Sequence, residues 1–150
     1  MFWILNLIFS YTASLFFGII FDVPKYLYNA VGIVGACGWM VYTLFYDGLE
    51  LHTIYSSFFG SLALGLLSHV MARYKKEPVI LFMVPGIIPL VPEGLAFDAT
   101  KNLILLDFSK AINTMLEVTL IAGAIALGLL FADQISKLIV SGTKFSKKHI

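Results

Sequence analysis

The segment VPGIIPLVPEG, residues 84–94, carries three prolines and two glycines inside an apolar run. A proline in a helix interior removes a hydrogen-bond donor, clashes with the preceding turn and costs roughly 3 kcal/mol in water. In lipid, backbone groups freed in this way need partners in protein or in a water-filled cavity. Interrupted spans of this kind recur at the substrate sites of transporters, where half-helix ends bind anions and unwound carbonyls coordinate cations. The segment therefore supplies six candidate substrate-path residues, Pro85, Gly86, Pro89, Pro92, Glu93 and Gly94.

The three prolines would share one face of a continuous helix and disturb three successive turns. We therefore predict a short helix over residues 79–84, an unwound stretch, and then a second short helix. The alternative is a kinked structural helix, because proline is commoner in membrane helices than in soluble ones. Glu93 is either a carboxylate of the site or the outer end of the span meeting water.

Two more polar residues, Asn113 and Glu117, lie four positions apart in the last apolar run and hence on one helical face. An ionisable group at membrane depth is costly and usually faces the bundle interior. Glu117 is therefore a candidate proton-binding carboxylate of the substrate path, with Asn113 beside it. The alternative is that Glu117 reaches the outer interface, since it lies only about two turns from Lys110.

Two charged or titratable side chains near the inner ends of the spans have a more ordinary explanation. Asp133 and Lys137 are four residues apart, so we predict an interfacial ion pair between them. His69 precedes Arg73 by one turn, and we assign it to the interface in preference to a proton relay.

The elements that must position these residues are membrane helices. Of the 150 residues, 59% are hydrophobic and 13% are charged, and the mean hydropathy is +0.91. Soluble domains are about 45–50% apolar and about a quarter charged. A span needs about 20 mostly apolar residues, and five segments qualify: 2–21, 27–45, 54–72, 79–97 and 111–135. We predict an all-α polytopic membrane bundle that forms a single integral-membrane domain over residues 1–150, with an interrupted fourth span and a basic tail at 136–150.

The distribution of positive charge predicts the orientation of this bundle. The connector after the third span contains Arg73, Lys75 and Lys76, whereas the connector with Asp47 and Glu50 contains no Lys or Arg. Cytoplasmic loops carry the excess of Lys and Arg. The tail is also basic, through Lys137, Lys144, Lys147 and Lys148. Both basic segments are therefore expected inside, which requires the fourth segment to cross and places the N-terminus outside.

Small residues recur at helical spacing in the second, third and fifth spans. Stripes of this kind allow membrane helices to approach closely, and they predict packing without indicating the cargo. The helix-packing candidates are Gly32, Gly35, Gly38, Ser57, Ser61, Gly65, Ala124 and Gly128.

Other classes of function find no support in the sequence. The single cysteine, Cys37, and three scattered histidines give no metal-ligand spacing, and no nucleophile–base pattern occurs, so we expect no enzyme, cofactor or metal site. A net charge of +1 without a basic stripe gives no reason to expect nucleic-acid binding. The N-terminus, MFWILNLIFS, lacks the positive flank and cleavage site of a signal peptide, so we expect a retained first span.

The proline segment, the amphipathic connector after it and the final run EVTLIAGAIALGLLFADQI resemble the C-terminal membrane domain of the threonine/serine exporter (ThrE-type) family. The likeness is to the short version, the YjjB-like small subunit, and extends over about residues 17–139. Glu93 departs from it, because a small residue would be expected after the third proline.

The resemblance implies a membrane subunit of an exporter of small polar metabolites, with threonine and serine, or dicarboxylates such as succinate, as cargo. It also implies a bacterial plasma-membrane location and a larger companion subunit that contains the other half of the transporter. The small number of spans independently favours assembly, with such a partner or with a second copy of the chain. The alternative function is a non-transporting assembly or regulatory subunit, in which Pro85, Pro89 and Glu117 could be replaced without loss of efflux.

Overall fold

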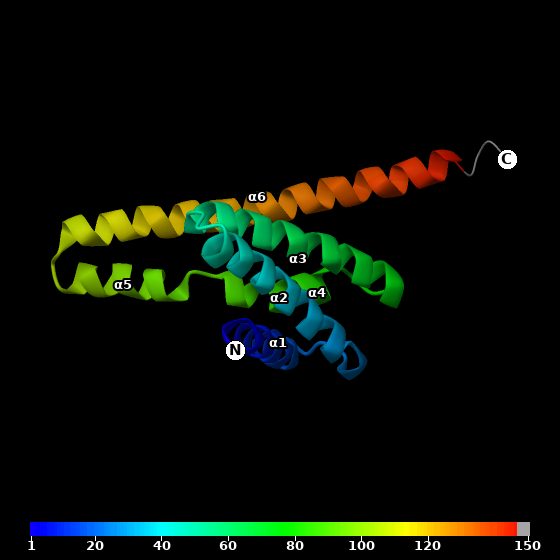
Figure 1. The fold of residues 1–150 in the computed structure, drawn as a ribbon, viewed down its shortest axis with the longest axis horizontal. Helices are drawn as coiled ribbons and strands as arrows, with labels where there is room; N and C mark the ends of the chain where they lie inside the picture. The colour runs from blue at the N-terminus through cyan, green and yellow to red at the C-terminus, as the bar shows by residue number, and fades with distance from the viewer. Residues whose placement is uncertain (147–150) are drawn as a thin grey trace.

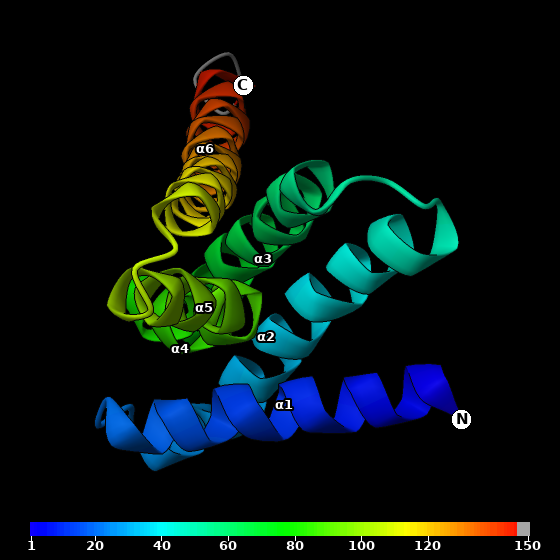
Figure 2. The same ribbon diagram turned by 90° about the vertical axis from the view of Figure 1, so that its left-hand side faces the viewer.

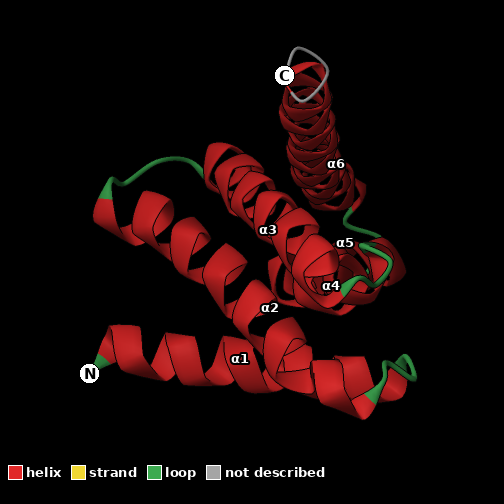
Figure 3. Ribbon diagram, turned by 90° about the vertical axis from the view of Figure 1, so that its right-hand side faces the viewer, coloured by secondary structure: helices red, strands yellow, loops and turns green. Residues whose placement is uncertain are grey.

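The computed structural model describes residues 1–146, with side chains up to Ile139, and this part of the chain consists of helices joined by short connections (Figures 1 and 3). The elements in chain order are α1 (Phe2–Ile20), η1 (Lys25–Leu27), α2 (Tyr28–Thr43), η2 (Leu44–Gly48), α3 (Thr53–Lys75), α4 (Ile80–Ile87), η3 (Ile88–Leu90), α5 (Glu93–Ile104) and α6 (Phe108–Ser146). The prediction of an all-α bundle is confirmed.

Within the described residues, four segments are long and apolar enough to cross a membrane: Phe2–Ile20, Lys25–Gly48, Thr53–Lys75 and Phe108–Ile139. A fifth candidate is the pair Ile80–Leu90 and Glu93–Ile104, whose axes are bent by 56° at the break between them. The structure therefore contains four uninterrupted candidate spans and one interrupted segment, at the position where the sequence predicts an interruption.

The exact position of the break differs from the prediction. Helix α4 runs through Pro85 and Gly86 to Ile87 and does not end at residue 84. The bend falls at Val91 and Pro92. A proline disfavours the helical region for the residue before it, and Val91 has φ −69° and ψ 131°, whereas Ile88 before Pro89 stays helical with φ −52° and ψ −45°. At Pro92 the chain makes a tight inverse γ-turn, in which the Glu93 amide donates to the Val91 carbonyl at 2.8 Å.

The boundaries of the last two helices also differ from the prediction. Helix α5 extends to Ile104, past the predicted end of the fourth span at 97, so it includes part of the stretch expected as an amphipathic connector. Helix α6 begins at Phe108 and continues to Ser146, which includes much of the stretch expected as a tail. The remaining tail residues, 147–150, lie outside the described residues.

The interior of the bundle is built around α2. Leu27, Val31 and Val34 are fully buried there, and Leu64 of α3 and Phe82 of α4 pack against them with no exposed surface. Figure 2 shows α1 and α6 on opposite sides of the molecule, with α2 and α3 between them. Helices α5 and α6 form a hairpin whose closed end extends beyond the other helices (Figure 1).

Charged connections gather at the two ends of this arrangement. The turn after α1 and the turn after α3 meet at one end, where the Tyr26 hydroxyl donates to the Glu77 carboxylate. This end carries the basic residues Lys25, Arg73, Lys75 and Lys76. The connection after α2 and the α5–α6 turn lie toward the opposite end (Figure 1).

Candidate functional site

The broken segment is held in the bundle by α1 and α2, which meet α4 at small residues. A Cβ atom added to Gly35 of α2 would lie 1.8 Å from Ser14 Oγ of α1 and 3.3 Å from Gly86 Cα of α4. A Cβ atom at Gly86 would in turn lie 3.2 Å from Val34 Cγ1. Pro85 and Gly86 are buried at this crossing, so the backbone that the proline disturbs is shielded by protein and does not face lipid.

Ser14 at this crossing is a fully buried polar residue, and its Oγ has no hydrogen-bond partner within the described part of the chain. One turn earlier, Ser10 Oγ donates to the Asn6 carbonyl at 2.7 Å, which is the usual solution for a helical serine. A buried hydroxyl without a partner loses the hydrogen bonds it would make with water, at a cost of about 1–3 kcal/mol. Ser14 is thus a buried polar group whose hydrogen-bonding capacity is unused at the crossing of α1, α2 and α4.

A groove of about 260 Å³ opens on the same side of α1, next to the break. Its walls come from α1, α2 and η3, and its lining residues are Asn6, Phe9, Ser10, Ala13, Trp39 and Pro89. The Trp39 indole Nε1 donates to Asn6 Oδ1 at 2.9 Å, which fixes the amide in the groove wall. The groove therefore combines neutral hydrogen-bonding groups with aromatic and aliphatic surface, as small-molecule sites commonly do.

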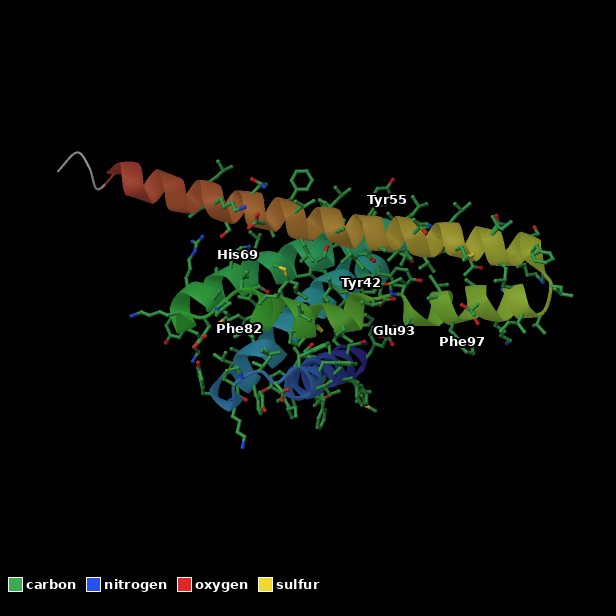
Figure 4. All side chains as sticks on the ribbon, turned by 180° about the vertical axis from the view of Figure 1, so that it is seen from behind. Tyr42, Tyr55, His69, Phe82, Glu93 and Phe97 are labelled. Carbon is green, nitrogen blue, oxygen red and sulfur yellow. The ribbon has the colours of Figure 1, made fainter. Side chains whose placement is uncertain are left out.

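Among the predicted path residues, Pro85, Gly86 and Pro89 lie inside the bundle or at the groove, whereas Glu93 and Gly94 do not. Glu93 and Gly94 are exposed at the first turn of α5, and no atom lies within 4 Å of where a Gly94 Cβ would be. Figure 4 places Glu93 at the bend, with Phe97 one turn further along α5. A carboxylate at a helix N-terminus is stabilised by the helix dipole. Pro92, which makes the bend, is half-buried.

Asn113 and Glu117 lie on α6 in the hairpin with α5, away from the groove lining. Asn113 is exposed and Glu117 is half-buried. The small residues Ala99 and Ala111 are buried in the hairpin. The structure therefore separates these two candidates from the groove beside Pro89, and it does not gather all the predicted path residues at one point.

The predicted packing residues lie mainly at helix crossings. Added Cβ atoms would come within 2.8 Å of Leu64 Cβ at Gly38, 2.6 Å of Ala132 Cβ at Gly65, and 2.0 Å of Ser61 Oγ at Gly128. At Gly32 the nearest atom would be Cε2 of Tyr11, at 2.5 Å. Ser57 and Ala124 are also buried, and Ser57 Oγ has no hydrogen-bond partner within the described residues.

Sequence reasoning missed the polar face of the first span. Asn6, Ser10 and Ser14 follow one another at intervals of four residues, which places them on one side of α1, and Gly18 continues the row. This spacing was readable without coordinates, but the N-terminal run was interpreted only as an apolar span. Trp39 could not be assigned in the same way, because its contact with Asn6 joins residues that are 33 positions apart.

Ionic contacts lie away from the groove. The predicted ion pair is confirmed, with Lys137 Nζ 2.6 Å from Asp133 Oδ2. At the start of α6, the ammonium group of Lys110 and its backbone amide hold the pKa of Asp107 below the usual aspartate value. Within the described residues, no three His, Cys, Asp or Glu side chains are close enough to hold a metal ion.

Comparison with known proteins places these features in a family. A family model described as "Threonine/Serine exporter, ThrE" matches residues 6–135. A protein of Haemophilus influenzae, described as an uncharacterized protein, is 26% identical over 133 residues, which cover 83% of this chain and 44% of that protein. The chain thus spans less than half the length of this curated relative, and no solved structure matches it. Because the family model covers most of the chain, from the polar face of α1 through the broken segment and into α6, the chain belongs to the threonine/serine exporter family.

Proposed function

We propose that the chain is one membrane subunit of an exporter of small polar metabolites, such as threonine, serine or a small dicarboxylate like succinate. Membership of the exporter family supports transport as the general function. The observation that carries the proposal is the groove beside the broken segment, where Asn6, Ser10 and Trp39 face Pro89. A polar cargo that crosses lipid must exchange its water shell for such hydrogen-bonding groups.

The prolines before the break also leave backbone carbonyls without helical donors. Pro85 and Pro89 have no N–H, so the carbonyls four residues before them, at Leu81 and Pro85, lose their usual helical donors. Free carbonyls at membrane depth are tolerated where they line a cavity or are covered by protein. We therefore assign the path to the side of α4 and η3 that faces α1 and α2, and not to exposed Glu93.

The remaining walls of the path are proposed to come from a larger companion subunit. The relative from Haemophilus influenzae is more than twice as long as the part matched here, so more than half of that protein lies outside the match. Within the described residues, the groove is lined by α1, α2 and η3, and it is not enclosed. A second copy of the chain could supply the missing wall in place of a companion.

We also propose that residues 1–150 form a single integral-membrane domain of the bacterial plasma membrane, with five crossings and the N-terminus outside. The broken segment then counts as the fourth crossing. The basic turns that contain Lys25, Arg73, Lys75 and Lys76 would face the cytoplasm, and the connection with Asp47 and Glu50 would face outward. Tyr26 and Glu77 link the two basic turns, which supports a common side for them.

Reconstitution of this chain into liposomes, with and without its companion, tests the proposal. The assay follows the efflux of labelled threonine, serine and succinate from loaded vesicles. Ser10→Ala should lower the rate of efflux at unchanged assembly, because it removes a hydroxyl from the groove wall. Thr12→Val is the matched control, because Thr12 bonds to the Ile8 carbonyl on the same helix and does not line the groove.

Two results would count against the proposal. Absence of flux for each cargo in every pairing would remove transport as the function. Normal flux in a Ser10→Ala and Asn6→Ala double variant would remove the groove from the path and favour a non-transporting assembly or regulatory subunit.

A further inference from the structure

A cluster of titratable groups lies between α3 and α6, away from the groove, and the proposed path does not use it. His69 Nε2 of α3 lies 3.6 Å from Asp133 Oδ1 of α6, with side-chain exposures of 16% and 33%. Figure 4 labels His69 where α3 and α6 run side by side. The distance is too long for a hydrogen bond, and Nε2 is buried with no partner within the described residues.

The charged groups around His69 already interact with other residues. Arg73 Nη2 donates to the Ser136 carbonyl at 2.9 Å and to Ser136 Oγ at 2.6 Å. Lys137 Nζ lies 2.6 Å from Asp133 Oδ2, so one carboxylate oxygen has a cation and the other faces the imidazole. Asp133, Arg73 and Lys137 are the charged groups that act on His69 within the described residues, and they come from the two helices that pack there.

The two groups are close but make no hydrogen bond in this arrangement. A neutral imidazole carries one N–H, on Nδ1 or on Nε2, and an Nε2 without the proton faces the negative carboxylate oxygen across 3.6 Å. A protonated imidazole donates from both nitrogens, and a charge-assisted N–H···O contact has a length of about 2.7–2.9 Å. Histidine is also the side chain that ordinarily changes charge between about pH 5 and 8.

We propose that His69 and Asp133 form a proton-binding site that clamps α3 to α6 when it is occupied. The proton adds to Nε2, the imidazolium donates to Asp133 Oδ1, and Lys137 remains on Oδ2 of the same carboxylate. Arg73 stays with Ser136, so it fixes the two helix backbones one turn further along. The inference does not depend on export, and its test measures proton binding and geometry only.

The packing around the cluster means that closing the clamp would move α3 and α6 relative to each other. One turn before His69, a Cβ atom on Gly65 would lie 2.6 Å from Ala132 Cβ, so α3 and α6 are already in close contact there. Closing the 3.6 Å gap by about 0.7–0.9 Å therefore requires a small adjustment of the two ends beyond this contact. Because α6 continues into the hairpin with α5, the clamp acts on the helix that connects to the broken segment.

Solid-state NMR of the full chain in lipid bilayers tests the site directly. The protein is labelled with ¹⁵N in histidine and ¹³C in aspartate, and the ¹⁵N–¹³C dipolar coupling is measured at pH 8 and pH 5. The expected result is an imidazolium with both ring nitrogens protonated at pH 5, but not at pH 8, and a stronger coupling between Nε2 of His69 and Cγ of Asp133 at pH 5. The His69→Gln variant identifies the signal by its loss.

Two variants separate the clamp from a general effect of pH. Asp133→Asn, prepared with ¹³C in asparagine so that Cγ of residue 133 is still observed, should abolish the change in contact, because the neutral amide does not attract the imidazolium as a carboxylate does. His52→Asn is the matched control, since His52 lies at the start of α3 outside the cluster and asparagine keeps a side-chain acceptor at the helix cap. This control should leave the pH-dependent coupling intact.

The proposal is overturned if the coupling between His69 and Asp133 is the same at both pH values, or if Asp133→Asn leaves the change unaltered. An equal loss in His52→Asn would also contradict it, because the effect would then not arise at the cluster. A failure of transport in vesicles would leave this measurement unaffected, so the two proposals can fail separately.

Discussion

Gly35→Ala is expected to destabilise the chain, because it forces apart the helices that hold the broken segment. The new Cβ would lie 1.8 Å from Ser14 Oγ and 2.5 Å from Ser14 Cβ. Rotation of the serine side chain relieves the first contact but not the second, since a Cβ is fixed by the backbone. Carbon atoms pack at about 3.5–4.0 Å, so α1 and α2 must separate by about 1 Å.

The expected cost follows from this separation. Overpacking of a well-packed interior usually costs about 1–3 kcal/mol, and 1.4 kcal/mol is a tenfold change in an equilibrium constant. The ratio of folded to unfolded Gly35→Ala chain should therefore fall by about one to two powers of ten relative to the wild type. Ser14→Gly removes the opposing Cβ, so the double variant should recover most of the loss, which gives a coupling free energy of about 1–3 kcal/mol.

SDS-induced unfolding in mixed micelles, followed by far-UV circular dichroism, measures this difference. Gly123→Ala is the matched control, because no atom lies within 4 Å of where its Cβ would be. This change should be neutral or stabilise the helix by about 0.5–1 kcal/mol, since alanine is the better helix former. A Gly35→Ala chain as stable as the wild type, or a Gly123→Ala chain equally destabilised, would refute the close crossing of α1, α2 and α4.

Three further changes follow from other parts of the structure. Gly128→Ala should separate α3 from α6 and destabilise the chain by about 1–3 kcal/mol, because its Cβ would lie 2.6 Å from the Phe58 carbonyl oxygen. The same unfolding assay measures this loss, and wild-type stability would contradict the contact. Pro92→Ala removes the steric restriction that a proline places on the backbone of Val91, so the 56° bend should decrease. The distance between spin labels at the exposed positions 80 and 104 should then grow, and an unchanged distance would mean that packing alone sets the bend. Asp107→Asn should lower the stability of the fold at neutral pH, because it removes a carboxylate whose pKa is lower in the folded than in the unfolded state. The ionised carboxylate stabilises the fold above the unfolded-state pKa, and this stabilisation is lost as the pH falls through the folded-state pKa. The difference between Asp107→Asn and wild type in the unfolding assay should therefore disappear in strong acid, and a difference that persists there would contradict the ionic origin.

The helical content and the interrupted segment could be predicted from the sequence, because lipid imposes long apolar spans and restricts proline to shielded places. The sequence does not indicate which of the three prolines, Pro85, Pro89 or Pro92, interrupts the helix. Pro85 lies inside α4 because the neighbouring helices shelter the backbone that it disturbs, and Pro89 lies in the first turn of η3, where its missing N–H is not needed. Only Pro92 acts on a residue, Val91, that leaves the helical region.

The candidate site was only partly within reach of sequence reasoning. The four-residue spacing of Asn6, Ser10 and Ser14 was available, but it was not recognised as a polar face. The position of Glu117 depends on the hairpin of α5 and α6. If α5 ended at residue 97, as predicted, instead of at Ile104, a different part of α6 would lie beside α5. Such long-range placement depends on tertiary contacts that no local pattern specifies.

Cysteine accessibility in the complete transporter is the measurement that decides whether the break lines a path for polar cargo. In a Cys37→Ala background, single substitutions Ser10→Cys, Pro89→Cys and Val84→Cys are treated with a membrane-impermeant, hydrophilic thiol reagent. Positions 10 and 89 line the groove beside η3, whereas Val84 is exposed on α4 away from it. We expect Ser10→Cys and Pro89→Cys to be labelled and to be protected by transported substrate, with Val84→Cys unlabelled in lipid. The polar route would lie elsewhere if Val84→Cys were labelled while Ser10→Cys and Pro89→Cys were not. The same conclusion would follow if substrate left the labelling unchanged.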